Sequence, residues 1–177
     1  MLSRLIIHTF LSIFALMLIV SCGESNTHTK NVNLDSLKEP LVNANKIYVK
    51  KEADEIDQYI KFKNLDMQKS GTGLRYMIYN KGAGIQAKMG MYAKISYKIS
   101  LLNGTICYSS DKSGPKQFMI GQDNIESGLH EGITYMHVGD KALLILPSHL
   151  AHGLLGDEDK IPPRSSVVYD IELISVH

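Results

Sequence analysis

The stretch Tyr92-Ala-Lys-Ile-Ser-Tyr-Lys-Ile-Ser-Leu101, followed by Leu102-Asn-Gly-Thr105, decides the fold of this chain. Its alternate positions form two rows, one of Tyr92, Lys94, Ser96, Lys98 and Ser100, the other of Ala93, Ile95, Tyr97, Ile99 and Leu101. This alternation predicts a half-buried β-strand. Asn103-Gly104 is the favoured residue pair of a type I′ turn, so the sequence predicts a hairpin that returns through Thr105-Ile-Cys-Tyr108.

Further strand and helix signals surround this hairpin. Strands are predicted at residues 74–79, 118–120, 141–146 and 166–174, and residues 148–164 form a long loop with two glycines and Pro162-Pro163. Apolar residues at positions 125, 129, 133 and 136 have the spacing of a short helix with one buried face. One helix against an antiparallel sheet is an α+β fold.

A longer helix is predicted before this domain, over residues 46–69. Its apolar stripe consists of Val49, Ala53, Ile56, Ile60 and Met67, and Ser70-Gly-Thr-Gly73 ends it. Two interpretations stay open. The helix either packs on its own domain or pairs with a second copy of the chain in a homodimer.

The N-terminus has the pattern of an export signal. A basic start at Arg4 precedes the mostly apolar run of residues 5–20, which is too short for a permanent membrane span. Ile19-Val-Ser-Cys-Gly23 resembles the bacterial lipobox. That resemblance implies removal of residues 1–21 and lipidation of Cys22, whereas the alternative is a lone buried cysteine. Residues 22–45 are polar and aperiodic and are predicted to be a flexible tether, in which Pro40 disfavours a helix.

Composition excludes several classes of function. The 177 residues include 19 basic and 18 acidic side chains, so there is no basic excess for a nucleic-acid partner. With Cys22 lipidated, Cys107 has no partner for an intramolecular disulfide. Neither the histidines nor Asp157-Glu-Asp159 have the spacing of metal ligands, and that acidic triplet is predicted to be a solvated loop tip. No metal or other cofactor is expected.

Residues from about 72 to 176 resemble the FKBP-type peptidyl-prolyl cis-trans isomerases. The matching pieces include Leu102-Asn-Gly-Thr105, Phe118-Met-Ile-Gly121, Gly128-Leu-His-Glu-Gly132, Met136-His-Val-Gly-Asp-Lys-Ala142, Ala151-His-Gly153, Ile161-Pro-Pro163 and Val168-Tyr-Asp-Ile-Glu-Leu173. The resemblance implies a twisted antiparallel sheet wrapped over one short helix. It also implies isomerase activity on X–Pro bonds of polypeptide clients, without a cofactor.

The lipobox, the helix before the domain and segments such as Leu154-Leu-Gly-Asp157 resemble lipoprotein FKBPs of the Bacteroidetes type, some of which are tied to gliding motility. The expected role is to assist the folding of exported proteins in the bacterial envelope. Gly23-Glu24 lacks the aspartate that often retains lipoproteins at the inner membrane. The expected location is therefore the outer membrane, facing the periplasm.

The resemblance also assigns pocket residues. The positions of catalytic groups fall on Tyr97, Tyr108, His152 and Tyr169, and those of substrate-binding groups on Cys107, Phe118, Ile125, Glu126, Leu129 and Ile161. The backbone N–H of Glu126 is expected to bind the ligand carbonyl. Several residues depart from the family pattern, namely Cys107, Tyr108, Lys116, Leu129, His152 and Tyr169. Two hypotheses therefore stay open: an isomerase of low or narrow activity, and a degenerate FKBP domain that acts as a chaperone or as a protein-binding module.

Overall fold

Strand β3 (Tyr92–Leu101) is the central element of the computed structural model, which describes residues 34–177. It pairs along its length with β7 (Val167–Val176), and also with β4 (Ile106–Ser109) and β5 (Lys116–Met119). The sheet order is β1-β2-β6-β7-β3-β4, with β5 beside β3, and every pairing is antiparallel. The remaining strands are β1 (Gln68–Lys69), β2 (Arg75–Asn80) and β6 (Lys141–Leu146).

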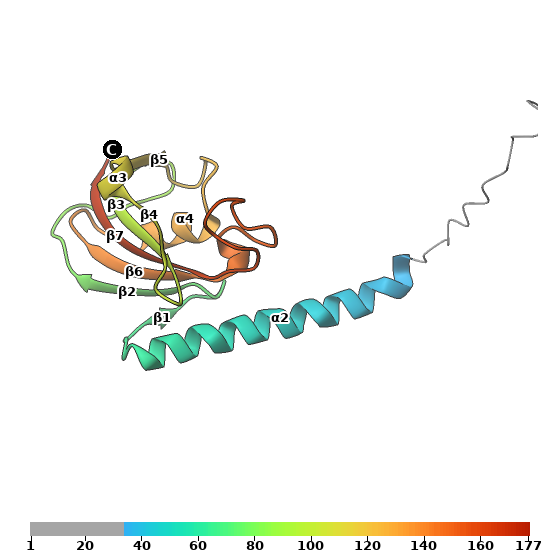
Figure 1. Ribbon diagram of the computed structural model, residues 1–177. Coiled ribbons are helices and arrows are strands. Elements are labelled where there is room, and N and C mark those ends of the chain that lie inside the picture. The colour runs from blue at the N-terminus through green and yellow to red at the C-terminus, as the bar shows by residue number, and fades with distance from the viewer. Residues whose placement is uncertain (1–33) are drawn as a thin grey trace, which may run out of the picture. The chain divides into compact units, whose positions relative to one another are not determined.

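The sheet curves around one short helix, α4 (Ser127–Thr134), as Figure 1 shows. The helix buries Leu129 and Ile133 in the main core, where they join Phe118, Leu144 and Tyr169. It approaches the sheet closely at its two glycines, because a Cβ at Gly132 would lie 2.5 Å from Leu144 Cδ1. The predicted α+β fold is confirmed.

The predicted hairpin is present, but its turn differs from the predicted type I′ turn. A type I′ turn needs positive φ at both central residues. Gly104 has φ 89°, but Asn103 does not have a positive φ. In the described part of the chain, the non-glycine residues with positive φ are Asn64, Glu158 and Arg164. The Gly104 N–H instead donates to the carbonyl of Leu101 (2.9 Å), and Asn103 Oδ1 accepts from Thr105 N–H (2.9 Å). The turn therefore lies one residue earlier, with glycine in the left-handed position that follows it.

The N-terminal helix α2 (Leu34–Phe62) starts earlier and ends earlier than the predicted helix over 46–69, and it replaces part of the predicted tether. Pro40 lies inside it. Proline lacks an N–H and crowds only the preceding turn, so the helix can continue after it. The helix ends because Asn64 adopts φ 52° and the N–H groups of Asn64 and Leu65 donate back to Lys61 and Ile60. This is a Schellman C-cap, for which asparagine is a common residue.

The second half of α2 packs against the sheet of its own domain. Ile56 is fully buried against Ile145 and Val168, in a second core cluster that Met67 also contacts after the helix has ended. Arg75 is almost fully buried and pairs with Asp57 at 2.8 Å. These contacts agree with the first interpretation of the helix. The homodimer through residues 46–69 stays a prediction.

Two short helical elements were not predicted. Helix α3 (Ser110–Ser113) follows β4, and its N-cap Ser109 accepts a hydrogen bond from Asp111 N–H. A 3₁₀ turn over Ser148–Leu150 opens the long loop that ends near Arg164.

The predicted signal peptide, lipobox and Cys22 lie outside the described residues, as does the tether up to residue 33. From residue 34 onward, no helix combines the length and the apolar character that crossing a membrane requires.

Candidate active site

A cavity of about 290 Å³ opens where β3, β7, α4 and the long loop meet. Its lining residues are Ile95, Tyr97, Ile99, Tyr108, Lys116, Glu126, Leu129, His152, Asp157 and Tyr169. Three of them, at positions 95, 97 and 99, alternate along β3 and therefore share one face of the sheet. The volume of the cavity is at the small end of the range for ligand sites, which suits a ligand with a single small ring.

The floor of the cavity is apolar. Ile95 and Leu129 are fully buried, and Ile99 is nearly so. Leu129 comes from the first turn of α4. This floor can hold a small apolar ring by the same burial that stabilises the protein core.

Polar atoms from three elements meet at one side of this floor. The Tyr169 hydroxyl donates to Glu126 Oε1 at 2.7 Å. His152 Nε2 lies 3.1 Å from the same oxygen, but its direction is not that of a hydrogen bond, and Nε2 is buried without a partner. Burial, together with the nearby Glu126 carboxylate, holds the pKa of Tyr169 well above its usual 10.0, so its hydroxyl remains a donor.

A second tyrosine–carboxylate pair lies at the mouth. The Tyr108 hydroxyl donates to Asp157 Oδ2, and Lys160 Nζ lies 4.7 Å from the Tyr108 ring centroid. This hydrogen bond, reinforced by burial, raises the pKa of Tyr108. Burial alone would raise the pKa of Asp157. The hydrogen bonds from Tyr108 and from the N–H groups of Ile161, Asp159 and Lys160 outweigh it and lower the pKa to about 2.

Asp157 corrects the prediction that residues 157–159 form only a solvated loop tip. Its Oδ1 accepts N–H hydrogen bonds at 2.7–3.0 Å from Asp159, Lys160 and Ile161. Aspartate commonly organises a turn in this way. The carboxylate therefore orders the loop that closes one wall of the cavity.

The third tyrosine, Tyr97, is positioned by α3. Its hydroxyl lies 2.8 Å from Ser113 Oγ, and its backbone N–H donates to Ser110 Oγ at 3.0 Å. The short helix after the hairpin thus orients this side chain at the cavity wall.

The structure brings together six of the ten residues that the sequence assigned to the pocket: Tyr97, Tyr108, Glu126, Leu129, His152 and Tyr169. The other four, Cys107, Phe118, Ile125 and Ile161, do not line this cavity and pack in or against the main core. Cys107 Sγ points toward the carbonyl of Lys160 at 3.7 Å, and burial raises the pKa of its thiol.

Sequence reasoning missed three lining residues, Ile95, Ile99 and Asp157, and treated Lys116 only as a departure from the family pattern. The strand alternation that placed Tyr97 on one face could have found Ile95 and Ile99. No local pattern pairs Asp157 with Tyr108, because 49 residues separate them.

The backbone N–H of Glu126 was expected to bind a ligand carbonyl. Within residues 34–177 this N–H makes no hydrogen bond, whereas the neighbouring N–H of Ile125 donates to Asp123 and that of Leu129 to the Glu126 carbonyl. It precedes the first turn of α4, where N–H groups lack partners within the helix. It is therefore free to donate to a ligand.

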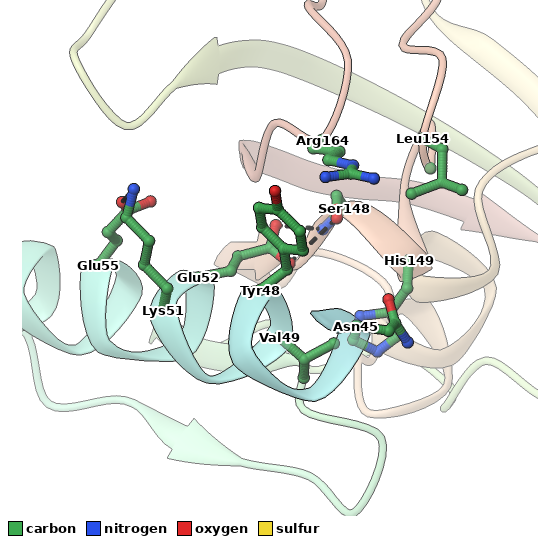
Figure 2. A pocket seen from close by; sticks show the side chains of 11 residues that line it. Asn45, Tyr48, Val49, Lys51, Glu52, Glu55, Ser148, His149, Leu154 and Arg164 are labelled. Atoms are coloured by element: carbon green, nitrogen blue, oxygen red, sulfur yellow. Dashed lines mark hydrogen bonds and ion pairs between the residues drawn. The ribbon is translucent and has the colours of Figure 1, made fainter. Parts of the chain in front are cut away.

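A larger cavity of about 590 Å³ lies beside α2 and is shown in Figure 2. Its wall includes Tyr48, Val49 and Leu154, and Arg164 lies 4.3 Å from the Tyr48 ring centroid. At its base, Glu52 accepts hydrogen bonds from Ser148 N–H, Ser148 Oγ and Ser166 Oγ. These contacts fasten the helix. Of these two cavities the smaller is the better candidate for catalysis, because it combines an apolar floor with converging hydroxyl and carboxylate groups.

The described part of the chain holds no group of three or more His, Cys, Asp or Glu side chains suited to a metal ion.

A curved antiparallel sheet around one short helix, with a small apolar pocket edged by tyrosines, is an FKBP-like fold. The family model of the FKBP-type peptidyl-prolyl cis-trans isomerases matches residues 84–174. FK506-binding protein 2 of Dictyostelium discoideum is 39% identical over 94 residues, which cover 52% of this chain and 71% of that protein. The chain belongs to the FKBP-type peptidyl-prolyl cis-trans isomerase family.

The similarity to FkpA proteins extends beyond this domain. The FKBP-type isomerase FkpA of Buchnera aphidicola is 32% identical over 149 residues, 81% of this chain and 61% of that protein's length. The crystal structure of FkpA from Escherichia coli matches with a TM-score of 0.63 at 29% identity, over 81% of this chain and 69% of that one. The crystal structure of AtFKBP13 matches with a TM-score of 0.60 at 31% identity, over 63% of this chain and 99% of that one. The chain is thus a homologue of FkpA, and both comparisons confirm the FKBP-like fold.

Proposed function

We propose that this chain catalyses cis-trans isomerisation of X–Pro bonds in polypeptides, in the cavity lined by Tyr97, Leu129 and Tyr169. The observation that carries the proposal is the combination of an apolar floor with a backbone N–H that has no partner in the described residues. An X–Pro bond rotates slowly because rotation gives up amide resonance, at a cost of about 18–20 kcal/mol. A catalyst needs only to favour the twisted amide.

The pocket can favour the twisted amide in two ways. The planar amide carries more separated charge than the twisted amide, and an apolar surround formed by Ile95, Ile99 and Leu129 disfavours that charge. The Glu126 N–H can hold the substrate carbonyl while the remainder of the bond rotates. No covalent intermediate and no proton transfer are needed, so the altered pocket residues do not remove a required nucleophile.

The test is the rate of proline isomerisation in a short Leu-Pro peptide with the full chain and with three variants. We expect the wild type to accelerate the reaction. Tyr97→Ala and Leu129→Asp should abolish the acceleration, whereas Tyr48→Ala, at the other cavity, should retain it. A spontaneous rate with the folded wild type would rule the proposal out.

The second candidate function is the one that the sequence left open, a non-catalytic chaperone or binding module. The larger cavity beside α2 supports it, because Leu154 and Leu155 are exposed near its wall and could contact unfolded polypeptide. Suppression of client aggregation by a Leu129→Asp variant, and its loss in a Tyr48→Ala/Leu154→Ala variant, would favour this function. Loss in both variants would assign any chaperone activity to the smaller pocket.

We further propose that the chain is a lipoprotein of the bacterial envelope, anchored through Cys22 in the outer membrane and facing the periplasm. The support is sequence: a basic start, a short apolar run and Ile19-Val-Ser-Cys-Gly23. Several acyl chains would give stable anchoring where one alone is marginal. Wild-type chain should separate with outer-membrane vesicles and Cys22→Ser should not. Equal distribution of the two would contradict the anchor.

Three narrower assignments rest on the same ground. The export signal supports exported proteins as folding clients. The lipobox, together with segments such as Leu154-Leu-Gly-Asp157, supports the Bacteroidetes lipoprotein subfamily and its relation to gliding motility.

The apolar stripe of the helix over residues 46–69 supports a homodimer. Deletion of the gene should impair surface spreading, and sedimentation should give twice the monomer mass. Normal spreading and a monomer mass would argue against these two assignments respectively.

A further inference from the structure

The side chain of Glu126 has an oxygen that nothing in the described chain satisfies. The residue lines the isomerase cavity, and its side chain is only 9% exposed. Oε1 accepts from Tyr169, but Oε2 is buried without a hydrogen-bond partner. A buried carboxylate oxygen without a donor is costly, so a donor that enters the cavity gains interaction energy there.

The other polar groups of the cavity do not meet this need. His152 Nε2 lies 3.1 Å from Oε1, and no hydrogen bond joins it to either oxygen of Glu126. Tyr169 and Tyr108 already direct their hydroxyl hydrogens at carboxylates. The Asp157 carboxylate is fully used, since it accepts from Tyr108 and from three backbone N–H groups. Glu126 Oε2 is therefore the carboxylate oxygen of the cavity that is left to accept a hydrogen bond from a ligand.

The charges of the lining residues point the same way. Glu126 and Asp157 are acidic and Lys116 is basic, and His152, which faces Glu126, is a cation only when it is protonated. Lys116 is exposed at the start of β5, so water screens its charge. Glu126 is buried, where a charge acts more strongly on a neighbour. The net effect on a ligand is that of a negative site.

We propose that Glu126 is a specificity-determining residue that selects proline peptides with a lysine or arginine next to the proline and discriminates against glutamate or aspartate there. This inference rests on the proposed isomerase function and names the substrate class of the same pocket. The cationic side chain donates to Glu126 Oε2 while the proline ring occupies the floor over Leu129. An acidic side chain meets a like charge in a poorly solvated site.

The experiment compares peptides that differ only in the residue beside the proline, with Lys, Leu or Glu at either flank. Isomerisation kcat/KM and peptide Kd are measured at low ionic strength with the full chain. The wild type should prefer Lys over Glu by about tenfold at one flank or more, the size expected for a charge-assisted hydrogen bond. In Glu126→Gln the preference should fall to about twofold or less.

Glu158→Gln is the matched control, since Glu158 is an exposed residue of the long loop and does not line the cavity. It removes one negative charge and should keep the full preference. A wild-type preference below about twofold at both flanks, or one that Glu126→Gln leaves intact, overturns the inference. If the Leu peptide is accelerated while the preference is flat, only this inference fails. If no peptide is accelerated but Lys peptides bind tighter, the isomerase function fails and the inference stands.

Discussion

The hydroxyl of Tyr108, on β4, donates a hydrogen bond to the carboxylate of Asp157, which lies 49 residues further along the chain. The bond joins the hairpin to the long loop across the mouth of the smaller cavity, the candidate active site. Asp157 also accepts three N–H hydrogen bonds from its own loop. One carboxylate thus sets both the shape of the loop and its position over the cavity.

Removal of the Tyr108–Asp157 hydrogen bond should lower both the isomerase activity and the unfolding free energy. Tyr108→Phe should destabilise the fold by about 0.5–1.5 kcal/mol, as for a typical hydrogen bond, and should lower isomerase kcat/KM several-fold because the loop is less well held. Denaturant unfolding and peptide kinetics measure the two effects. Tyr79→Phe is the control, because Tyr79 also donates to an aspartate, Asp170, at 2.6 Å but does not line the cavity. Equal kcat/KM in the two variants would contradict the account.

The same carboxylate predicts a pH dependence of stability. The folded-state pKa of Asp157 is lowered from its ordinary 3.8 to about 2. Its contribution is therefore fully present above the unfolded pKa and is lost as pH falls from about 4 toward about 2. The difference in unfolding free energy between wild type and Asp157→Asn should be constant above about pH 5 and shrink below about pH 4. A difference that persists unchanged to pH 2 would show that the carboxylate is not held in this way.

Attachment of α2 to the domain depends on Glu52. Both oxygens of its carboxylate accept hydrogen bonds from Ser148, and Oε1 also accepts one from Ser166. A glutamine would replace one of these oxygens by an N–H₂ group, which cannot accept the hydrogen bonds that the oxygen accepted. Glu52→Gln should lower the unfolding free energy by about 1.5–3 kcal/mol. Glu55→Gln is the matched control. Glu55 lies one turn further along and makes only an exposed pair with Lys51 at 3.7 Å, so its loss should cost about 0.5 kcal/mol or less. Similar losses of unfolding free energy in both variants would contradict the claim that Glu52 holds α2 against the domain.

Removal of one partner of the Tyr169–Glu126 hydrogen bond should destabilise the fold more than replacement of both partners by apolar residues. Tyr169→Phe removes the donor to Glu126 Oε1 and leaves both oxygens of a buried carboxylate without a hydrogen bond. A loss of about 1–3 kcal/mol is expected. Adding Glu126→Leu to that variant should recover much of it, because two apolar groups then face each other. Thermal unfolding of the single and double variants measures the coupling, and simple additivity of the two losses would contradict it.

Much of the fold could be predicted because its signals are local. The alternation of residues 92–101 gave β3 with its observed bounds, and the apolar spacing from residue 125 onward located α4. The turn type was wrong because Asn-Gly favours two residues with positive φ only when both occupy the central positions. Here the chain places Leu102 and Asn103 there instead. Asn64 is a common residue at the end of a helix and could have predicted where α2 ends. The prediction extended the helix to residue 69 because Met67 continues the apolar spacing.

The polar contacts of the site could not be predicted from the sequence. Tyr108 meets Asp157, and Tyr169 meets Glu126, only because the sheet and the loop bring distant segments together. The family pattern located Tyr108, Tyr169 and Glu126 but not Asp157. It said nothing about the partners of the two tyrosines, since both tyrosines depart from that pattern. It also assigned Cys107 and Phe118 to the pocket, whereas both side chains turn into the core.

The most direct test of the central claim is the exchange rate between cis and trans forms of a Leu-Pro peptide, measured by NMR in the presence of catalytic amounts of the full chain. The account predicts exchange faster than the spontaneous rate, in proportion to chain concentration, and its loss in Tyr97→Ala. Exchange at the spontaneous rate with correctly folded wild-type chain would contradict the claim that this cavity is an isomerase site.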